Sequence, residues 1–241
     1  MPYKSLRRRK VPVKPRYRRR IGGPRKRRVV RRAGKRMSKP SSRTMPTSFP
    51  DKMRIKVHYD TSYVTSNATG LYTEIQLRGN SLYDPEVTIG GSQPYSFAAW
   101  SAFYRKYRVH GSSVRVTAYP TGGTIIANTT QIILLPTSNS SDASGVAVDV
   151  VTQMPYAKNS ISNAFKGQST LSSYMSTRKM FGIDKPQFGR EVYEGFVSGD
   201  PTTQWYWNIL AGPITSGQVT AMVYKVRITY YAELYERKVT P

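Results

Sequence analysis

The residues with the clearest chemistry are the arginines and lysines of the first 43 positions. This segment contains 14 arginines and six lysines but no Asp or Glu. An arginine guanidinium presents a planar fork of N–H donors that matches the oxygens of a phosphate group. Each basic side chain placed against a phosphate also releases condensed counterions, so binding is strong, salt-sensitive and indifferent to base sequence. We therefore predict that this segment binds a nucleic-acid backbone.

The predicted contact residues lie in the arm, which we define as residues 1–50, and at the start of the strand that follows it. Lys52, Arg54 and Lys56 alternate with apolar residues, so their side chains share one face of that strand. We favour a DNA-facing role for them, but solvent exposure and pairing with acidic residues of a neighbouring copy stay open. The full set of predicted nucleic-acid contacts is Arg7, Arg8, Arg9, Lys10, Lys14, Arg16, Arg18, Arg19, Arg20, Arg25, Lys26, Arg27, Arg28, Arg31, Arg32, Lys35, Arg36, Lys52, Arg54 and Lys56.

Charge is divided very unevenly along the chain. The whole sequence of 241 residues has a formal charge of +25, but after the first 43 positions only 18 basic residues face all 13 acidic ones. The arm also contains seven prolines and few large apolar residues, a composition that stays disordered on its own. We therefore expect a disordered basic arm over residues 1–50 and a nearly neutral folded body over residues 51–241. Basic clusters such as Arg7–Lys10 and Arg25–Arg28 also suit recognition by nuclear import machinery.

Residues suited to catalysis or metal binding are sparse. The sequence has no cysteine and only two histidines, His58 and His110, each of which we interpret as a surface or structural residue. Glu191 and Glu194 stand close together, but with no further carboxylate nearby they make a poor metal site. No glycine-rich phosphate-binding motif occurs. We expect no enzyme activity, no cofactor and no metal.

Apolar runs of about 18–20 residues, the length that spans a bilayer, are absent, and no apolar stretch follows the basic N-terminus. We therefore expect neither membrane insertion nor a secretory signal.

The body shows the period of two that is typical of half-buried strands. The clearest example is the apolar series from Met222 to Leu234, which alternates with polar residues such as Lys225 and Arg227. Eight extended segments are expected, separated by turn-rich spacers: 52–65, 71–78, 107–119, 124–135, 146–153, 170–179, 203–212 and 217–236.

Helix signals are rare in the body. One short helix is expected from Phe97 to Tyr104, with Ser96 as its N-cap. Trp205 and Trp207 share the face of Ile209, and we assign both to the core. The pattern predicts an all-β fold, a single antiparallel eight-stranded jelly-roll sandwich; a sandwich of immunoglobulin type is the alternative.

Three blocks of sequence resemble a known family. Leu77–Pro85 (LRGNSLYDP), Phe103–Ser112 (FYRKYRVHGS) and Tyr174–Gly182 (YMSTRKMFG) resemble coat proteins of circovirus-like viruses, which have circular single-stranded DNA genomes and encode a replication initiator. Together with the Arg-rich start and the Tyr-rich final strand, the resemblance covers essentially the whole chain.

The resemblance implies a jelly-roll capsid subunit and a small icosahedral, T=1 shell of about sixty copies. It also implies a single-stranded DNA genome packaged by the arm, and a location in the virion and, during assembly, in the host nucleus. About sixty arms would bring about 1,200 positive charges to the genome. The host receptor is not indicated by the sequence. The alternative function is that of a cellular nucleic-acid-binding protein such as a ribosomal component, which predicts basic residues spread over the body.

Overall fold

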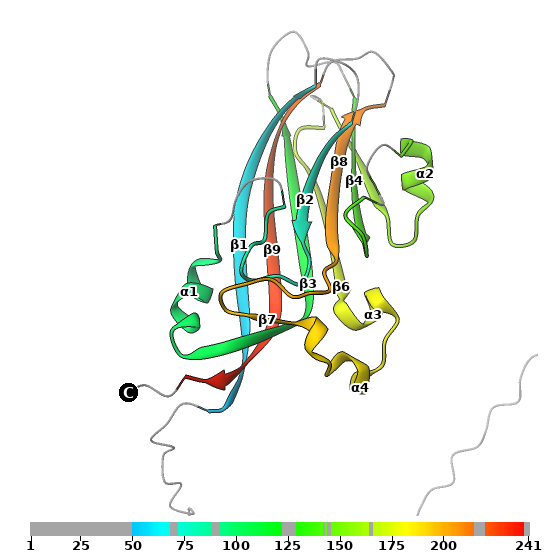
Figure 1. The fold of residues 1–241 in the computed structure, drawn as a ribbon. Coiled ribbons are helices and arrows are strands. Elements are labelled where there is room, and N and C mark those ends of the chain that lie inside the picture. Colours follow the sequence, from blue (N-terminus) through cyan, green and yellow to red (C-terminus); the bar gives the residue numbers. More distant parts are fainter. Residues whose placement is uncertain are drawn as a thin grey trace, which may run out of the picture. The chain divides into compact units, whose positions relative to one another are not determined.

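Two antiparallel sheets face each other across a shared core (Figure 1). The computed structural model describes residues 50–67, 72–87, 92–121, 129–141, 143, 146–163, 166–214 and 220–238. The first sheet has the order β1–β9–β3–β6, and the short β7 pairs with β3 beside the end of β6. Its strands are β1 (Lys52–Asn67), β9 (Thr220–Arg237), β3 (Tyr104–Pro120), β6 (Ser169–Ser176) and β7 (Glu194–Phe196).

The second sheet has the order β2–β8–β4–β5. Of its neighbouring pairs, only β4 and β5 follow each other in the chain, so the strands cross repeatedly from one sheet to the other. This interleaving is the strand order of an eight-stranded jelly roll, with β7 as an addition, and it differs from the hairpin-rich order of immunoglobulin sandwiches. The predicted jelly roll is confirmed. The strands are β2 (Thr73–Arg78), β8 (Tyr206–Pro213), β4 (Thr130–Thr137) and β5 (Lys158–Ser162).

The core between the sheets is centred on large aromatic side chains. Trp205 and Trp207 have no exposed surface, and their ring centroids lie 5.3 Å apart in an edge-to-face arrangement. Burial of a side chain of this size stabilises the fold by ~4–6 kcal/mol as an upper bound. The prediction that both tryptophans belong to the core is confirmed, and they are not available for stacking on bases.

The residues that follow β2, Gly79 and Asn80, have a structural role at this core. The Asn80 amide donates to the Thr203 carbonyl oxygen at 2.8 Å and accepts from the Trp205 backbone N–H at 3.1 Å. Gly79 lies so close to the Trp205 ring that a Cβ atom there would be 2.4 Å from ring carbons. The Ser112 hydroxyl donates to the Gly79 carbonyl oxygen at 2.7 Å. These contacts fix the chain leaving β2 against both sheets.

One predicted strand is wrong and two strands were missed. Residues 148–153 of the predicted strand 146–153 form helix α2 (Val148–Gln153), in which Val151 is fully buried. A short apolar run does not distinguish a strand from a buried helix by periodicity alone. The missed strands are β5, a mostly polar edge strand, and β7, which has three residues. Neither carries the alternating apolar pattern that identified the others.

Element ends also differ from the prediction. Helix α1 (Tyr95–Ser101) begins after Pro94, so Ser96 lies inside it and is not the N-cap, and Tyr104 already belongs to β3. β4 continues through Pro136 to Thr137, while positions 124–128 of that predicted strand lie outside the described residues. The predicted strand 170–179 ends at Ser176, whose hydroxyl accepts from the Lys179 N–H and caps the next helix. The remaining elements are α3 (Thr177–Phe181), α4 (Lys185–Phe188) and the 3-10 helix η1 (Glu191–Tyr193).

Candidate nucleic-acid interface

The outer face of the first sheet carries a group of exposed basic side chains on β1, β3 and β9. Side chains alternate between the core and this face, and the antiparallel register sets them in rows across the strands. One row joins Asp60 of β1, Arg227 of β9 and Arg115 of β3. The next rows on either side include Lys225 and Thr229 of β9. The register therefore brings together charges that lie far apart in the sequence.

Five basic residues form what we call the basic strip. They line two adjoining hollows of about 410 and 430 Å³ on this face, and Arg115 and Arg227 belong to both hollows. The strip also includes the exposed rings of Tyr174 and Tyr231, whose centroids lie 5.9 Å apart. Its basic members are Lys56, Arg115, Lys158, Lys225 and Arg227.

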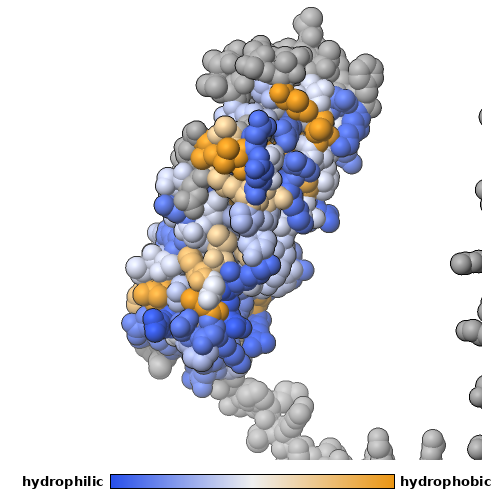
Figure 2. Space-filling model, turned by 90° about the vertical axis from the view of Figure 1, so that its right-hand side faces the viewer, coloured by the Kyte–Doolittle hydropathy of each residue, from blue (hydrophilic) through white to orange (hydrophobic). Residues whose placement is uncertain are grey.

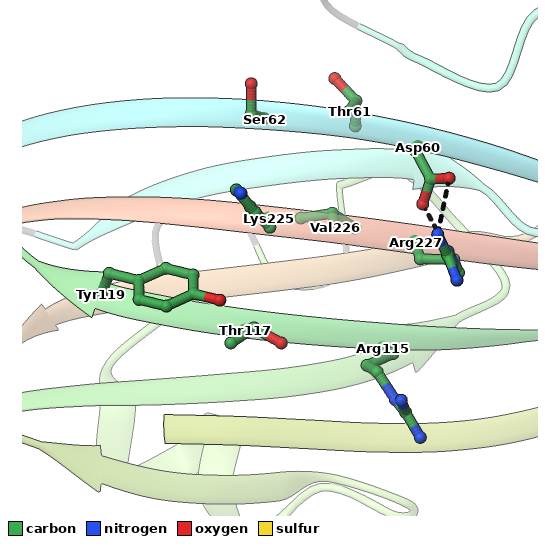
Figure 3. A pocket seen from close by; sticks show the side chains of 9 residues that line it. All are labelled: Asp60, Thr61, Ser62, Arg115, Thr117, Tyr119, Lys225, Val226 and Arg227. Atoms are coloured by element: carbon green, nitrogen blue, oxygen red, sulfur yellow. Dashed lines mark hydrogen bonds and ion pairs between the residues drawn. The ribbon is translucent and has the colours of Figure 1, made fainter. Parts of the chain in front are cut away.

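Asp60 is the acidic residue of the strip. Its carboxylate accepts from Arg227 Nε at 2.6 Å and from Arg227 Nη2 at 3.1 Å, and Figure 3 shows this pair beside Lys225 and Arg115. Hydrogen bonding and attraction from Asp60 raise the pKa of Arg227. Across the ranges that the structure covers, the other four basic residues of the strip have no ion pair with an acidic side chain. The strip is therefore a site of net positive charge.

The opposite end of the same face is balanced in charge. Glu194 of β7 pairs with Lys106 Nζ at 3.1 Å and with Arg108 Nη2 at 2.7 Å. Lys106 also pairs with Glu236 at 2.8 Å, and hydrogen bonding to these two carboxylates raises the pKa of Lys106. The Tyr235 hydroxyl donates to Glu194, and burial together with this contact raises the pKa of Tyr235. At this end Lys106 and Arg108 are therefore held in ion pairs within the chain.

The two histidines lie on this face as structural residues. His58 Nδ1 is 2.9 Å from the Thr229 hydroxyl across the β1–β9 pair. His110 is the extra residue at a bulge in β3, with its ring centroid 5.4 Å from that of Phe188. Burial lowers the pKa of His110. The positive charges of Arg54 and Arg108 also lower this pKa, whereas the negative charge of Glu233 raises it.

The predicted contact residues are placed only in part. All predicted residues from Arg7 to Arg36 lie outside the described residues. Lys52, Arg54 and Lys56 are exposed on the outer side of β1, opposite Tyr235, Glu233 and Tyr231 of β9. They share one face of the strand as the alternation predicts; that this face binds DNA stays a prediction. Of the three, Lys56 belongs to the basic strip, and Arg54 lies opposite a carboxylate.

Four basic residues of the strip were missed by sequence reasoning. Lys225 and Arg227 were visible as polar positions of the last strand, and Arg115 occupies the same kind of position in its strand. The missing information was the pairing of β3 with β9, which joins segments more than a hundred positions apart. Lys158 lies on the missed strand β5 and donates to the Ser172 carbonyl oxygen of β6 at 2.7 Å.

Other kinds of site find little support in the described parts of the chain. No group of three or more His, Asp or Glu residues there is arranged to hold a metal ion. Glu191 is exposed, whereas Glu194 is engaged in the ion pairs above. Among the described helices, none combines the length and apolar character needed to cross a membrane.

Comparison with known proteins finds only distant structural alignments. No family model and no curated protein matches the sequence. Solved structures that align with the chain include that of Desmodium yellow mottle tymovirus, at 12% identity and a TM-score of 0.39, covering 85% of this chain and 98% of that one. The decameric BFDV capsid protein aligns at 12% identity and a TM-score of 0.41, covering 76% and 99%. Turnip yellow mosaic virus aligns at 14% identity and a TM-score of 0.40, covering 80% and 98%. At these scores the fold assignment rests on the strand order.

Proposed function

We propose that this protein is a viral capsid subunit that assembles into a small closed shell and packages single-stranded DNA through its basic arm. The observation that carries the proposal is the division of charge. The first 43 residues hold 20 basic side chains and no acidic ones, and the remainder of the chain is nearly balanced. A shell needs this division, because a polycation must face the genome while the body packs against copies of itself.

The body supports the proposal through its fold and surface. The eight-stranded jelly roll is an architecture that viral capsid domains use. Apolar side chains available for contact between copies include Val150 of α2, 51% exposed, and Ile161 of β5, 46% exposed. Figure 2, which views the side on which α2 lies, shows hydrophobic residues in small patches separated by hydrophilic ones. Exposed apolar patches rimmed by polar residues are typical of surfaces that contact another protein.

The finer parts of the proposal come from the sequence. The resemblance favours a circular genome and a T=1 shell of about sixty copies. The basic clusters of the arm favour nuclear import before assembly. We propose that Lys52, Arg54 and Lys56 continue the DNA-binding surface from the arm onto β1, since the chain enters this strand directly from the arm.

Electron microscopy of the purified full-length protein tests assembly, and nuclease protection tests packaging. We expect hollow particles of uniform size, and protected DNA when the protein is produced with its genome. A soluble monomer that binds folded RNA would overturn the proposal and favour a cellular nucleic-acid-binding protein.

Deletion of residues 1–43 tests the role of the arm. We expect the circular dichroism signal of the β-sheets to persist while most DNA binding is lost, because a segment with so few large apolar residues contributes little to a core. For the full-length protein, log affinity should fall steeply as log salt concentration rises. Each phosphate contact with a single strand should add roughly 0.7 to the steepness of this slope. Undiminished binding after the deletion would show that the arm is not the principal site.

A further inference from the structure

We propose that the basic strip of the first sheet is a second nucleic-acid site, which binds the phosphates and bases of a single strand on the folded body. The inference rests on the proposed packaging function and extends it from the arm to named residues of three neighbouring strands, β9, β3 and β6. It involves Arg115, Lys225 and Arg227 as phosphate contacts and Tyr174 and Tyr231 as stacking surfaces.

The site is continuous along the strands. The two hollows of the strip meet at Arg115 and Arg227, and the second shares Lys56 and Tyr231 with a third hollow of about 440 Å³ that reaches Arg54. Along β1, the distance from Arg54 to Ser62 is about 26 Å, because each residue of a strand advances by about 3.3 Å. A surface of this length contacts several successive nucleotides of an extended strand.

The arrangement of charge indicates an anionic ligand. Arg115 and Arg227 are directly opposite each other on β3 and β9, and like charges in cross-strand pairs destabilise a sheet. Asp60 compensates Arg227 through its forked hydrogen bonds, but Arg115 has no acidic partner in the part of the chain that the structure describes. A phosphate between the two guanidinium groups would accept hydrogen bonds from both and remove the repulsion.

The aromatic side chains favour a single strand over a duplex. Tyr174 is 56% exposed and Tyr231 is 39% exposed, and the two rings meet edge to face at 73°. Lys56 Nζ lies 5.8 Å from the centroid of Tyr231, and Lys225 Nζ lies 5.9 Å from that of Tyr119, so rings and charges alternate across the strip. Bases of a single strand have free faces that stack on such rings, whereas a duplex keeps its bases stacked on one another.

Binding measurements on the full-length protein test the phosphate contacts. The strip variant Arg115→Gln/Lys225→Gln/Arg227→Gln is compared with the control Arg178→Gln/Lys185→Gln/Arg190→Gln, which removes the same charge from exposed positions around α3 and α4. The probe is a fluorescent thymidine oligonucleotide, titrated at several salt concentrations. The salt slope is the steepness with which log affinity falls as log salt concentration rises. We expect this slope to be about 2 lower for the strip variant than for the wild type, because three phosphate contacts of about 0.7 each are lost. For the control variant we expect the slope of the wild type.

Substitution and crosslinking of the tyrosines test stacking separately. We expect Tyr174→Leu to weaken oligonucleotide binding about five-fold or more and Tyr174→Phe, which keeps the ring, to bind like the wild type. Ultraviolet crosslinking of the wild-type complex followed by peptide mapping should recover peptides that contain Tyr174 or Tyr231. Equal losses in the two Tyr174 variants, or crosslinks confined to the arm, would contradict stacking on the strip.

The outcomes separate this inference from the proposed function. Suppose that the wild type forms particles and that its affinity for DNA falls steeply with salt. If the strip variant and its control then have the same affinity and salt slope, the second site is wrong and the capsid function stands. If the strip variant binds normally but fails to form particles, the strip is a contact for acidic residues of another copy, and the inference is again wrong. If the wild type neither assembles nor binds nucleic acid, the proposed function itself fails.

Discussion

The two sheets of the sandwich treat their outer faces in opposite ways. On the second sheet, α2 and neighbouring residues cover an apolar part of the outer face, where Ile133, Leu135 and Leu210 pack against Ala143 and Val151. The outer face of the first sheet is polar, and no described segment of the chain covers its basic strip. The second sheet thus buries part of its outer face within the chain, whereas the first sheet leaves its basic strip uncovered by the described residues.

The difference is visible in the residues of the strands. Ile132 to Leu135 of β4 are all buried, so this stretch of the strand has no polar face. In β9, by contrast, buried Val226 and Ile228 alternate with exposed Lys225 and Arg227. Alternation therefore marks the sheet face that is free for binding, and its absence marks the face that the chain itself covers.

The largest effect should follow from damage to the covered face. Ile133→Ala should lower the free energy of unfolding by about 2–5 kcal/mol, because the lost apolar contacts leave a cavity between β4 and α2. The matched substitution on the open face, Thr117→Ala, should change it by less than about 0.5 kcal/mol. Urea denaturation followed by tryptophan fluorescence measures both. Similar losses for the two variants would show that the open face is also packed, for instance against another copy.

The next largest effect concerns the edge of the open face. Lys52→Gln/Arg54→Gln/Lys56→Gln should leave particles intact while reducing the protected DNA and lowering the salt slope by up to about 2. Nuclease protection in purified particles measures the first quantity and oligonucleotide titration the second. Since Arg54 lies opposite Glu233, its share should be the smallest of the three. Normal oligonucleotide binding combined with failure to assemble would place these residues in a contact between subunits.

Most of the fold could be predicted from the sequence because most strands bury one face. Seven of the eight predicted segments overlap strands of the structure, and in β1 and β9 the alternation directly reports one-sided burial. The eighth predicted segment, around Val151, is wrong. Its β-branched residues suit a strand, but here they belong to helix α2, which packs one side against β4 and β8. β5 was not predicted because it is an edge strand with few contacts, and such a strand needs no apolar pattern.

The candidate site was predictable only where it is continuous in sequence. Lys52, Arg54 and Lys56 were found because they follow one another along one strand. Arg115 and Arg227 are more than a hundred positions apart and meet only through the β3–β9 register. A one-residue change in that register would move either side chain into the core, so charge counting along the chain does not locate the strip.

His110 should give the charge-balanced end of the open face a small pH dependence. Burial lowers its pKa in the folded state below the ordinary value of about 6.5. Arg54 and Arg108 lower the pKa further, and Glu233 offsets only part of this effect. The unfolded chain therefore binds more protons in this range, and the free energy of unfolding should fall as pH drops below about 6.5. His110→Gln should remove this part of the dependence, whereas His58→Gln, on the exposed side of β1, should keep it. Urea midpoints at about pH 8 and pH 5 measure the difference. An identical change with pH in the wild type and His110→Gln would contradict it.

The smallest effect should come from Asp60, the acidic residue of the basic strip. Asp60→Asn removes one negative charge and frees the Arg227 guanidinium while keeping the size of the side chain. Both partners of this pair are well exposed, so the urea midpoint should hardly change. Affinity for the thymidine oligonucleotide should instead rise, by at most about five-fold at low salt, because a phosphate no longer competes with a carboxylate for Arg227.

Asp149→Asn on α2 removes the same charge from a distant exposed position and should leave affinity unchanged. The gain from Asp60→Asn should also fade as salt increases, since the charges at this surface are screened by solvent ions. Weaker binding by Asp60→Asn would mean that the carboxylate orients Arg227 for the ligand. Equal gains from both variants would mean that only net charge matters, and the open face would then be no better than any other surface of the body.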